Sequence, residues 1–254
     1  MPNLALIHIH PFKSLDPVSV PEARFSPAGG LEGDRQFALF DADGKFVNGK
    51  RKPRIHQLRG RYDFRSRTLR LFDRDWNVDF DRAQLESLLA NHFGIPVTIK
   101  ENPNGGFPDD TASPGPTVIS TATLQAVADW FKLPLEQMRI RMRANLEISG
   151  VEPFWEDRLF GPNPARVRFQ IGGAILEGNN PCRRCIVPTR DPFNGEDFPG
   201  FKATFLQKRE QNTPPWADRT WFDHYYRLAV NTVTPPSEAW KSLRVGDEVR
   251  INQP

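Results

Sequence analysis

Proline and glycine interrupt this chain from end to end, and that feature limits the available folds more than any other. The 254 residues include 24 prolines and 18 glycines, and they are spread over the whole length. Proline ends helices and interior strands, whereas glycine supplies the positive backbone angles of tight turns. The pattern favours short strands joined by frequent turns over a helical bundle.

Between these breaks, short alternating or β-branched runs indicate strands. The predicted strands span residues 3–10, 35–40, 45–47, 62–64, 68–72, 117–119, 146–148, 167–171, 174–176, 226–233 and 245–251. Helices are expected over 83–93, ending at Gly94, after a cap at Ser120 or Thr121, and over 201–209. The basic run 139–143 alternates in a way that also suits one exposed strand face. We therefore predict a mainly β fold with peripheral helices (α+β) and barrel-like sheets.

The stretch from Asn102 to Pro116 is rich in Asn, Gly, Pro and Asp, which marks it as the expected boundary between two parts. The predicted parts are residues 1–110 and 111–254. With 38% apolar and 26% charged residues, the composition is that of a globular chain with a core.

Composition also excludes several classes of protein. The formal net charge of +3 is too small to indicate nucleic-acid binding. No run of about 18 apolar residues is present, so no membrane span is expected. The N-terminus has no basic segment followed by a long apolar stretch, which argues against a signal peptide. The two cysteines are separated by only two residues and suit a disulfide poorly, so we expect a reducing, cytoplasmic location.

The densest group of reactive residues surrounds Cys182 and Cys185, in the run Pro181-Cys182-Arg183-Arg184-Cys185. A structural zinc site needs further Cys or His ligands that the chain does not offer nearby. A thioredoxin-like pair normally lies where a strand enters a helix, whereas residues 186–188 here suggest a strand. A single thiolate ligand to a metal is the third option, and the flanking arginines favour a thiolate. Two buried, inert cysteines also remain possible at this level.

The wider context resembles a known family. The motif Pro-Cys-x-x-Cys-x-x-Pro-Thr-x-Asp-Pro-x-x-Gly-Glu, residues 181–196, is similar to the signature of MOSC domains, which are named after the C-terminal part of molybdenum-cofactor sulfurases. The segments 10–15 and 30–37 resemble the N-terminal β-barrel region that precedes the domain in one branch. That branch includes the mitochondrial amidoxime reducing component and its bacterial relatives. The resemblance covers the chain from about residue 4 to 251 and implies an N-terminal barrel-like region packed on a MOSC β-barrel.

The resemblance also implies a set of site residues. Cys185 matches the cysteine that ligates molybdenum, and the role of Cys182 is left open. Lys13, Ser14 and Arg35 match residues that hold the pterin-phosphate end of the molybdenum cofactor. Further cofactor contacts are implied at Arg143, Asn145, Asp110, Thr111, Ser113 and Ser120. Arginine and lysine suit an anionic phosphate, and a soft thiolate suits a metal already held by dithiolene sulfurs.

The implied activity is reduction of N-hydroxylated compounds, of amidoxime or hydroxylamine type, to amidines or amines. Some relatives carry an iron–sulfur domain, but the chain has no cysteines left to build one. A separate electron donor of the ferredoxin or flavin reductase type is therefore expected as a partner. The basic run 50–54 offers a docking patch for an acidic donor, or is simply a solvated loop. The alternative is a non-catalytic carrier that holds sulfur or the cofactor on Cys185 or Cys182.

Overall fold

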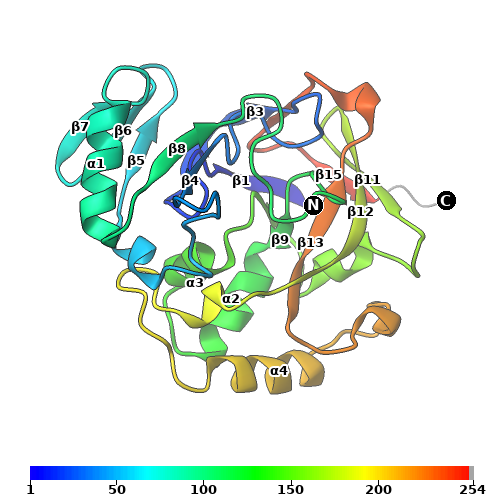
Figure 1. The fold of residues 1–254 in the computed structure, drawn as a ribbon. Coiled ribbons are helices and arrows are strands. Elements are labelled where there is room, and N and C mark those ends of the chain that lie inside the picture. Colours follow the sequence, from blue (N-terminus) through cyan, green and yellow to red (C-terminus); the bar gives the residue numbers. More distant parts are fainter. Residues whose placement is uncertain (252–254) are drawn as a thin grey trace.

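An eight-stranded sheet forms the centre of the computed structural model, which describes residues 1–251 (Figure 1). The strand order is β15-β11-β12-β13-β9-β10-β1-β2. In that order the strands span Val249–Ile251, Val167–Ile171, Ala174–Arg183, Arg227–Val233, Val118–Ser120, Leu146–Ser149, Asn3–Ile9 and Val18–Val20. Neighbours run antiparallel except β9 and β10, which are parallel.

Strand β1 links the N-terminal segment to the strands of the second half of the chain. β1 is hydrogen-bonded between β10 and β2, so the N-terminal segment completes a sheet built mostly from the second half of the chain. Leu4 and Ile7 of β1 are fully buried in one core with Phe169, Leu176 and Val230. The predicted boundary between residues 110 and 111 stays a prediction.

A second core lies in residues 12–99. Here β4 (Phe37–Phe40) pairs with β8 (Thr98–Glu101), and β5 (Arg61–Asp63), β6 (Thr68–Leu71) and β7 (Arg74–Asn77) form a small sheet. Figure 1 shows helix α1 (Arg82–Phe93) beside this small sheet. Leu85, Leu89 and Phe93 of α1 are buried, and Gly94 ends the helix with φ 67°. Left-handed backbone of this kind favours glycine at a helix end.

Three further helices cover the main sheet: α2 (Thr121–Trp130), α3 (Leu135–Met142) and α4 (Phe201–Gln211) (Figure 1). Their apolar side chains form a third core, in which Phe131 stacks on Phe201 at 4.1 Å between ring centroids. Two short strands, β3 (Glu22–Arg24) and β14 (Ser242–Arg244), form a separate antiparallel pair. The predicted α+β class is confirmed. Within residues 1–251, no helix is both long and apolar enough to cross a bilayer.

Four local predictions were wrong. Residues 45–47 form no strand, because only a single bridge joins Phe46 to Phe40. Residues 245–248 turn at Gly246, so only Val249–Ile251 is a strand. The basic run 139–143 lies in and just after α3 rather than on a strand. Residues 186–188 enter a 3-10 turn, η3 (Val187–Thr189), because Pro188 can occupy the first positions of such a turn.

Candidate functional site

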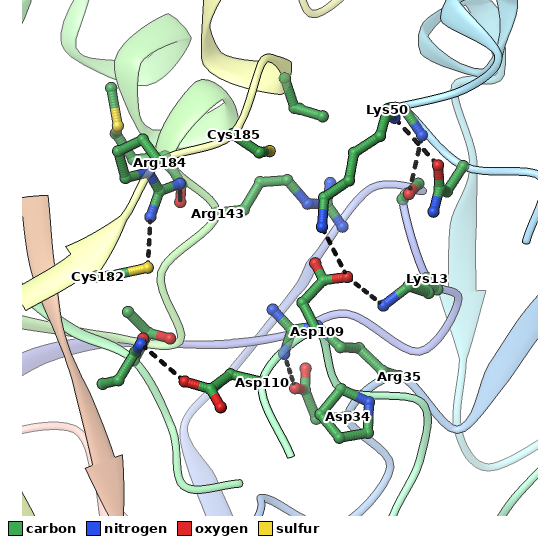
Figure 2. A pocket seen from close by; sticks show the side chains of 18 of the residues that line it. Lys13, Asp34, Arg35, Lys50, Asp109, Asp110, Arg143, Cys182, Arg184 and Cys185 are labelled. Atoms are coloured by element: carbon green, nitrogen blue, oxygen red, sulfur yellow. Dashed lines mark hydrogen bonds and ion pairs between the residues drawn. The ribbon is translucent and has the colours of Figure 1, made fainter. Parts of the chain in front are cut away.

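A cavity of about 330 Å³ opens where the N-terminal segments meet the strands of the second half (Figure 2). This volume falls at the lower end of the range usual for small-molecule sites. Its walls come from segments far apart in the sequence. These lie within residues 13–16, 30–35, 48–59, 105–117, 140–143 and 180–192, with Asn231.

The walls carry more positive than negative side chains. Seven lysines or arginines line the cavity: Lys13, Arg35, Lys50, Arg59, Arg143, Arg183 and Arg184. Four aspartates line it: Asp16, Asp34, Asp109 and Asp110. The surplus of cations in a concave, partly desolvated site favours an anionic ligand.

Lys13 and Ser14 follow β1, where Pro11 ends the strand. The Lys13 side chain is only 5% exposed, and its Nζ donates to the Phe107 carbonyl and to Asp109 Oδ1, both at 2.8 Å. Ser14 has φ 73°, and its Oγ accepts a hydrogen bond from the Gly49 amide at 3.3 Å. Both residues reach the cavity.

Arg35 is held by its neighbour Asp34, whose carboxylate it contacts through Nη1. Asp34 Oδ1 also accepts from the His10 amide at 2.8 Å and from Asn145 Nδ2 at 3.1 Å. Burial alone would raise the pKa of Asp34, but Arg35 and His10 outweigh it and hold that pKa below its usual range. The ionised carboxylate therefore fixes the guanidinium of Arg35 at the cavity wall.

Arg143 lies at the C-terminal end of α3 with φ 52°. Its Nη1 donates to the Leu15 carbonyl at 2.8 Å, and no carboxylate of residues 1–251 forms an ion pair with it. Burial, followed by the charge of Arg35, lowers the pKa of Arg143 to about 10, so it stays cationic at neutral pH. Like Ser14 and Arg35, it has left-handed backbone, which costs a non-glycine residue about 1 kcal/mol and is concentrated at functional sites.

The two thiols stand on one side of the cavity, and Lys13 and Arg35 stand on the other, with Arg143 between them in Figure 2. Both cysteines are free and partly exposed, and Cys185 follows the end of β12. Arg184 donates through Nη1 to Cys182 Sγ at 3.4 Å and through Nη2 to the Met142 carbonyl at 2.7 Å. The structure thus places Cys185 on the pocket wall, not in a sealed apolar interior.

The turn after Cys185 is held from two sides. Arg141 of α3 is 2% exposed and donates through Nη1 to the Pro188 carbonyl at 2.9 Å and to the Arg190 carbonyl. Arg190 in turn donates to the Gly49 carbonyl in the N-terminal part. These contacts fix the segment that carries Cys185 against both halves of the molecule.

The other predicted site residues divide into two groups. Asp110 and Ser113 line the cavity, and each accepts a hydrogen bond from a neighbouring strand: Asn231 Nδ2 donates to Asp110 Oδ2 at 3.3 Å and Asn179 Nδ2 to Ser113 Oγ at 2.8 Å. Thr111, Ser120 and Asn145 do not line it. Thr111 is exposed to solvent.

Ser120 and Asn145 have structural contacts instead. Ser120 is fully buried and caps α2 by accepting from the Thr123 amide at 3.0 Å. Such a cap satisfies a helix N–H that has no partner within the helix. Asn145 is 2% exposed and bonds to the His8 carbonyl, the Thr117 amide and Asp34, so it acts on the cavity through Asp34 and Arg35.

Several residues of the cavity wall were not selected by the sequence analysis. Asp34 orients Arg35, and its position directly before that arginine was the available signal. His56 lines the cavity, and its buried Nε2 has no hydrogen-bond partner in the part of the chain that the structure describes. Burial and the charges of Arg143 and Arg190 lower the pKa of His56 to about 4, so its imidazole is neutral at pH 7. Lys50, which the sequence assigned only to a basic run, is also on the wall.

Fold and pocket together define a class: a β-rich protein with a cavity that is lined by an excess of basic side chains and by a free thiol. Comparison with family models identifies that class. Residues 1–106 match the MOSC N-terminal beta barrel domain, and residues 116–250 match the MOSC domain. The chain belongs to the MOSC domain family, which is linked to the molybdenum cofactor.

Two solved structures are similar to the whole chain at low identity. One is a crystal structure of the YUAD protein from Bacillus subtilis, at 14% identity over 100% of this chain and 98% of that chain, with a TM-score of 0.42. The other is a crystal structure of a hypothetical protein, at 12% identity over 100% of this chain and 70% of that chain, also with a TM-score of 0.42. No curated protein sequence matches the chain.

Proposed function

We propose that the cavity holds a molybdenum cofactor and that the chain is an oxidoreductase that reduces N-hydroxylated compounds to amines or amidines. The single observation that carries the proposal is the position of Cys185, on the wall of the same cavity as Lys13, Arg35 and Arg143. In this proposal Cys185 is the protein's ligand to molybdenum.

The residues present fit such a cofactor. In the described part of the chain, Arg143 has no carboxylate partner in an ion pair, and the buried Nε of Arg184 has no hydrogen-bond acceptor. An anionic pterin with a phosphate group would supply acceptors for such donors. Among residues 1–251 there is no group of three or more His, Cys, Asp or Glu side chains arranged to hold a metal ion. A metal carried by an organic dithiolene needs only one further soft ligand, and Cys185 offers it.

Each part of the cavity has a separate task in this proposal. Lys13, Ser14 and Arg35 would bind the phosphate end, while Arg143 would neutralise charge between that end and the thiol. When bound, the cofactor would supply the two-electron redox chemistry that removal of oxygen from the substrate requires. The balance for a hydroxylamine is R–NHOH + 2 e⁻ + 2 H⁺ → R–NH₂ + H₂O.

Substrate would enter beside the thiol. Ile55, Leu58 and Val187 add apolar side chains to the cavity lining, and His56 adds a neutral imidazole. Arg141 and Arg190 hold the Cys185 segment in place and thereby keep the reacting centre at a fixed position. Such fixed positioning is one of the contributions that a protein makes to cofactor chemistry.

Electrons would come from a separate ferredoxin or flavin reductase type of protein. Lys50, Arg51 and Arg54 are exposed, and Lys50 also lines the cavity, which supports docking of an acidic donor near it. Two free cysteines support a reducing, cytoplasmic location.

The activity is tested with cofactor-loaded protein, a chemically reduced viologen as electron source and an aromatic amidoxime as substrate. The proposal predicts stoichiometric formation of the amidine in wild-type protein and in Cys182→Ser, and loss of turnover in Cys185→Ser. A loaded protein that consumes no reduced viologen in the presence of amidoximes or hydroxylamines would refute the reductase function.

One observation favours a second candidate, a carrier of sulfur or cofactor. Cys182 is partly exposed in the same cavity and accepts a hydrogen bond from Arg184, so two thiols are available together. A carrier that uses both thiols predicts equal loss of bound cargo in Cys182→Ser and Cys185→Ser. The reductase proposal predicts loss only in Cys185→Ser.

A further inference from the structure

One carboxylate, that of Asp109, lies between two lysines on the cavity wall (Figure 2). Its Oδ1 accepts from Lys13 Nζ at 2.8 Å and from Lys50 Nζ at 3.3 Å. Lys13 is almost completely buried, whereas the Asp109 side chain is 55% exposed. The buried ammonium is therefore covered by an acidic group that itself faces the open side of the site.

We propose that Lys50 is a further arm of the anion site and that Asp109 is an internal anion, which holds Lys13 and Lys50 together until a ligand phosphate takes its place. The inference deepens the proposed cofactor site and rests on it for the identity of the ligand. It assigns a binding role to Lys50, and to Asp109 the role of a competitor that sets the affinity.

The carboxylate of Asp109 already occupies the position between the two ammonium groups where a bound anion would lie. Burial would raise the pKa of Asp109, but the charges of Lys13, Lys50 and Arg35 hold it well below its usual range. The carboxylate is thus ionised at all ordinary pH values, and both lysines bond to the same oxygen. A phosphate monoester offers three acceptor oxygens and close to two negative charges at neutral pH. It can therefore satisfy both ammonium groups, with Arg35 as a third donor, better than one carboxylate oxygen can.

The residues on both sides of Asp109 have hydrogen bonds of their own. The Asp109 side chain can therefore move away from the two lysines while the neighbouring backbone stays in place. The next residue, Asp110, accepts from Asn231 of β13, and Ser113 accepts from Asn179 of β12. On the preceding side, the Phe107 amide donates to the Arg35 carbonyl at 2.8 Å. The segment is therefore anchored to the N-terminal part before Asp109 and to the main sheet after it. Only the side-chain contacts of Asp109 itself need to break.

The test uses cofactor-free protein, produced in a host that cannot make the cofactor, and inorganic phosphate as the probe. Isothermal titration calorimetry at low ionic strength in a phosphate-free buffer gives the dissociation constant. Asp109→Asn should bind phosphate about tenfold more tightly than wild type, because the competing charge is gone. Lys50→Gln added to Asp109→Asn should reverse most of that gain.

The matched control is Asp75→Asn, which removes the same charge from an exposed position of β7, outside the cavity. This control should leave the phosphate affinity unchanged. Asp109→Ser, which also removes the charge, should bind phosphate more tightly than wild type, as Asp109→Asn does. Equal or weaker phosphate binding by Asp109→Asn with an unchanged melting temperature would overturn the proposal, because Asp109 would then only position the lysines. The experiment involves no molybdenum and no turnover, so its outcome is separate from that of the reductase proposal.

Discussion

The side-chain amide of Asn145 donates to Asp34 Oδ1 at 3.1 Å and thereby links the residue before β10 to the turn that carries Arg35. The same amide nitrogen donates to the His8 carbonyl at 3.0 Å, and Oδ1 accepts from the Thr117 amide at 3.2 Å. One buried side chain thus joins β1, the residue just before β9 and the cavity wall that carries Arg35.

Replacing Asn145 by Asp should therefore destabilise the protein and weaken the anion site together. The variant loses two donors and sets a carboxylate against Asp34 in a buried place, which costs on the order of 3 kcal/mol. Urea unfolding should show the loss, and phosphate binding to cofactor-free protein should weaken in parallel. Adding Asp34→Asn should recover part of the stability, because it removes the like-charge pair. Full stability in Asn145→Asp alone would show that this network does not support the site.

Arg141 gives a second prediction, because its buried guanidinium fixes the turn after Cys185. Arg141→Met keeps much of the side-chain volume but removes the donors to the Pro188 and Arg190 carbonyls. The expected cost is about 2–4 kcal/mol of unfolding free energy, with faster alkylation of Cys185 by iodoacetamide. Arg139→Met is the matched control on the same helix. Its guanidinium bonds to Glu136 and Glu147 and not to that turn, so it should leave the alkylation rate unchanged.

Glu156 predicts a pH dependence of stability. It is 1% exposed, and its Oε2 accepts from the Thr123 hydroxyl at 2.9 Å, while Oε1 has no hydrogen-bond partner within residues 1–251. Burial, with the neighbouring charge of Asp157 as the next cause, raises the pKa of Glu156 from 4.5 to about 7. The folded state therefore binds this proton more tightly than the unfolded state, and stability contributed by the group falls as pH rises from 4.5 through 7.

The corresponding variant is Glu156→Gln, which keeps the acceptor for Thr123 and cannot ionise. Its melting temperature should exceed that of wild type at pH 8, and the difference should vanish near pH 4.5. The stabilisation is on the order of 3 kcal/mol at most. Glu152→Gln is the control, because it removes an exposed carboxylate paired with Arg158. Its melting temperature relative to wild type should show no such dependence on pH. A difference that is constant over the whole pH range would refute the assignment.

Strands with a clear period were predictable from the sequence, and buried polar contacts were not. The pair Val167–Ile171 and Ala174–Leu176 was found because β-branched residues flank a double-glycine turn. Helix α1 was found from its apolar spacing and Gly94. Helix α3 was missed because its arginines alternate along the sequence. Only the fold shows that Arg141 turns inward to two carbonyls while Arg139 pairs with Glu147.

Some residues of the site could also be selected from the sequence, and others are revealed only by the fold. The motif around Cys185 and the Lys13-Ser14 pair could be selected because their residue types and order carry the family resemblance. The cavity then brings these segments together with Arg35 and Arg143. Nothing local distinguishes Lys50 within its basic run or Asp109 within a polar loop, because their contact joins residues far apart in the chain. The resemblance implies a cofactor contact for Asn145, and this stays a prediction; its contacts within the protein are with His8, Thr117 and Asp34.

The central claim is that Cys185 holds molybdenum in this cavity. The most direct measurement is the ratio of molybdenum to protein, by elemental analysis together with a pterin fluorescence assay, in protein from a cofactor-competent host. We expect near-stoichiometric molybdenum and pterin in wild type and in Cys182→Ser, and at least about tenfold less molybdenum in Cys185→Ser. Undiminished molybdenum in folded Cys185→Ser, or wild-type protein without pterin from a host that loads other molybdenum enzymes, would contradict the account.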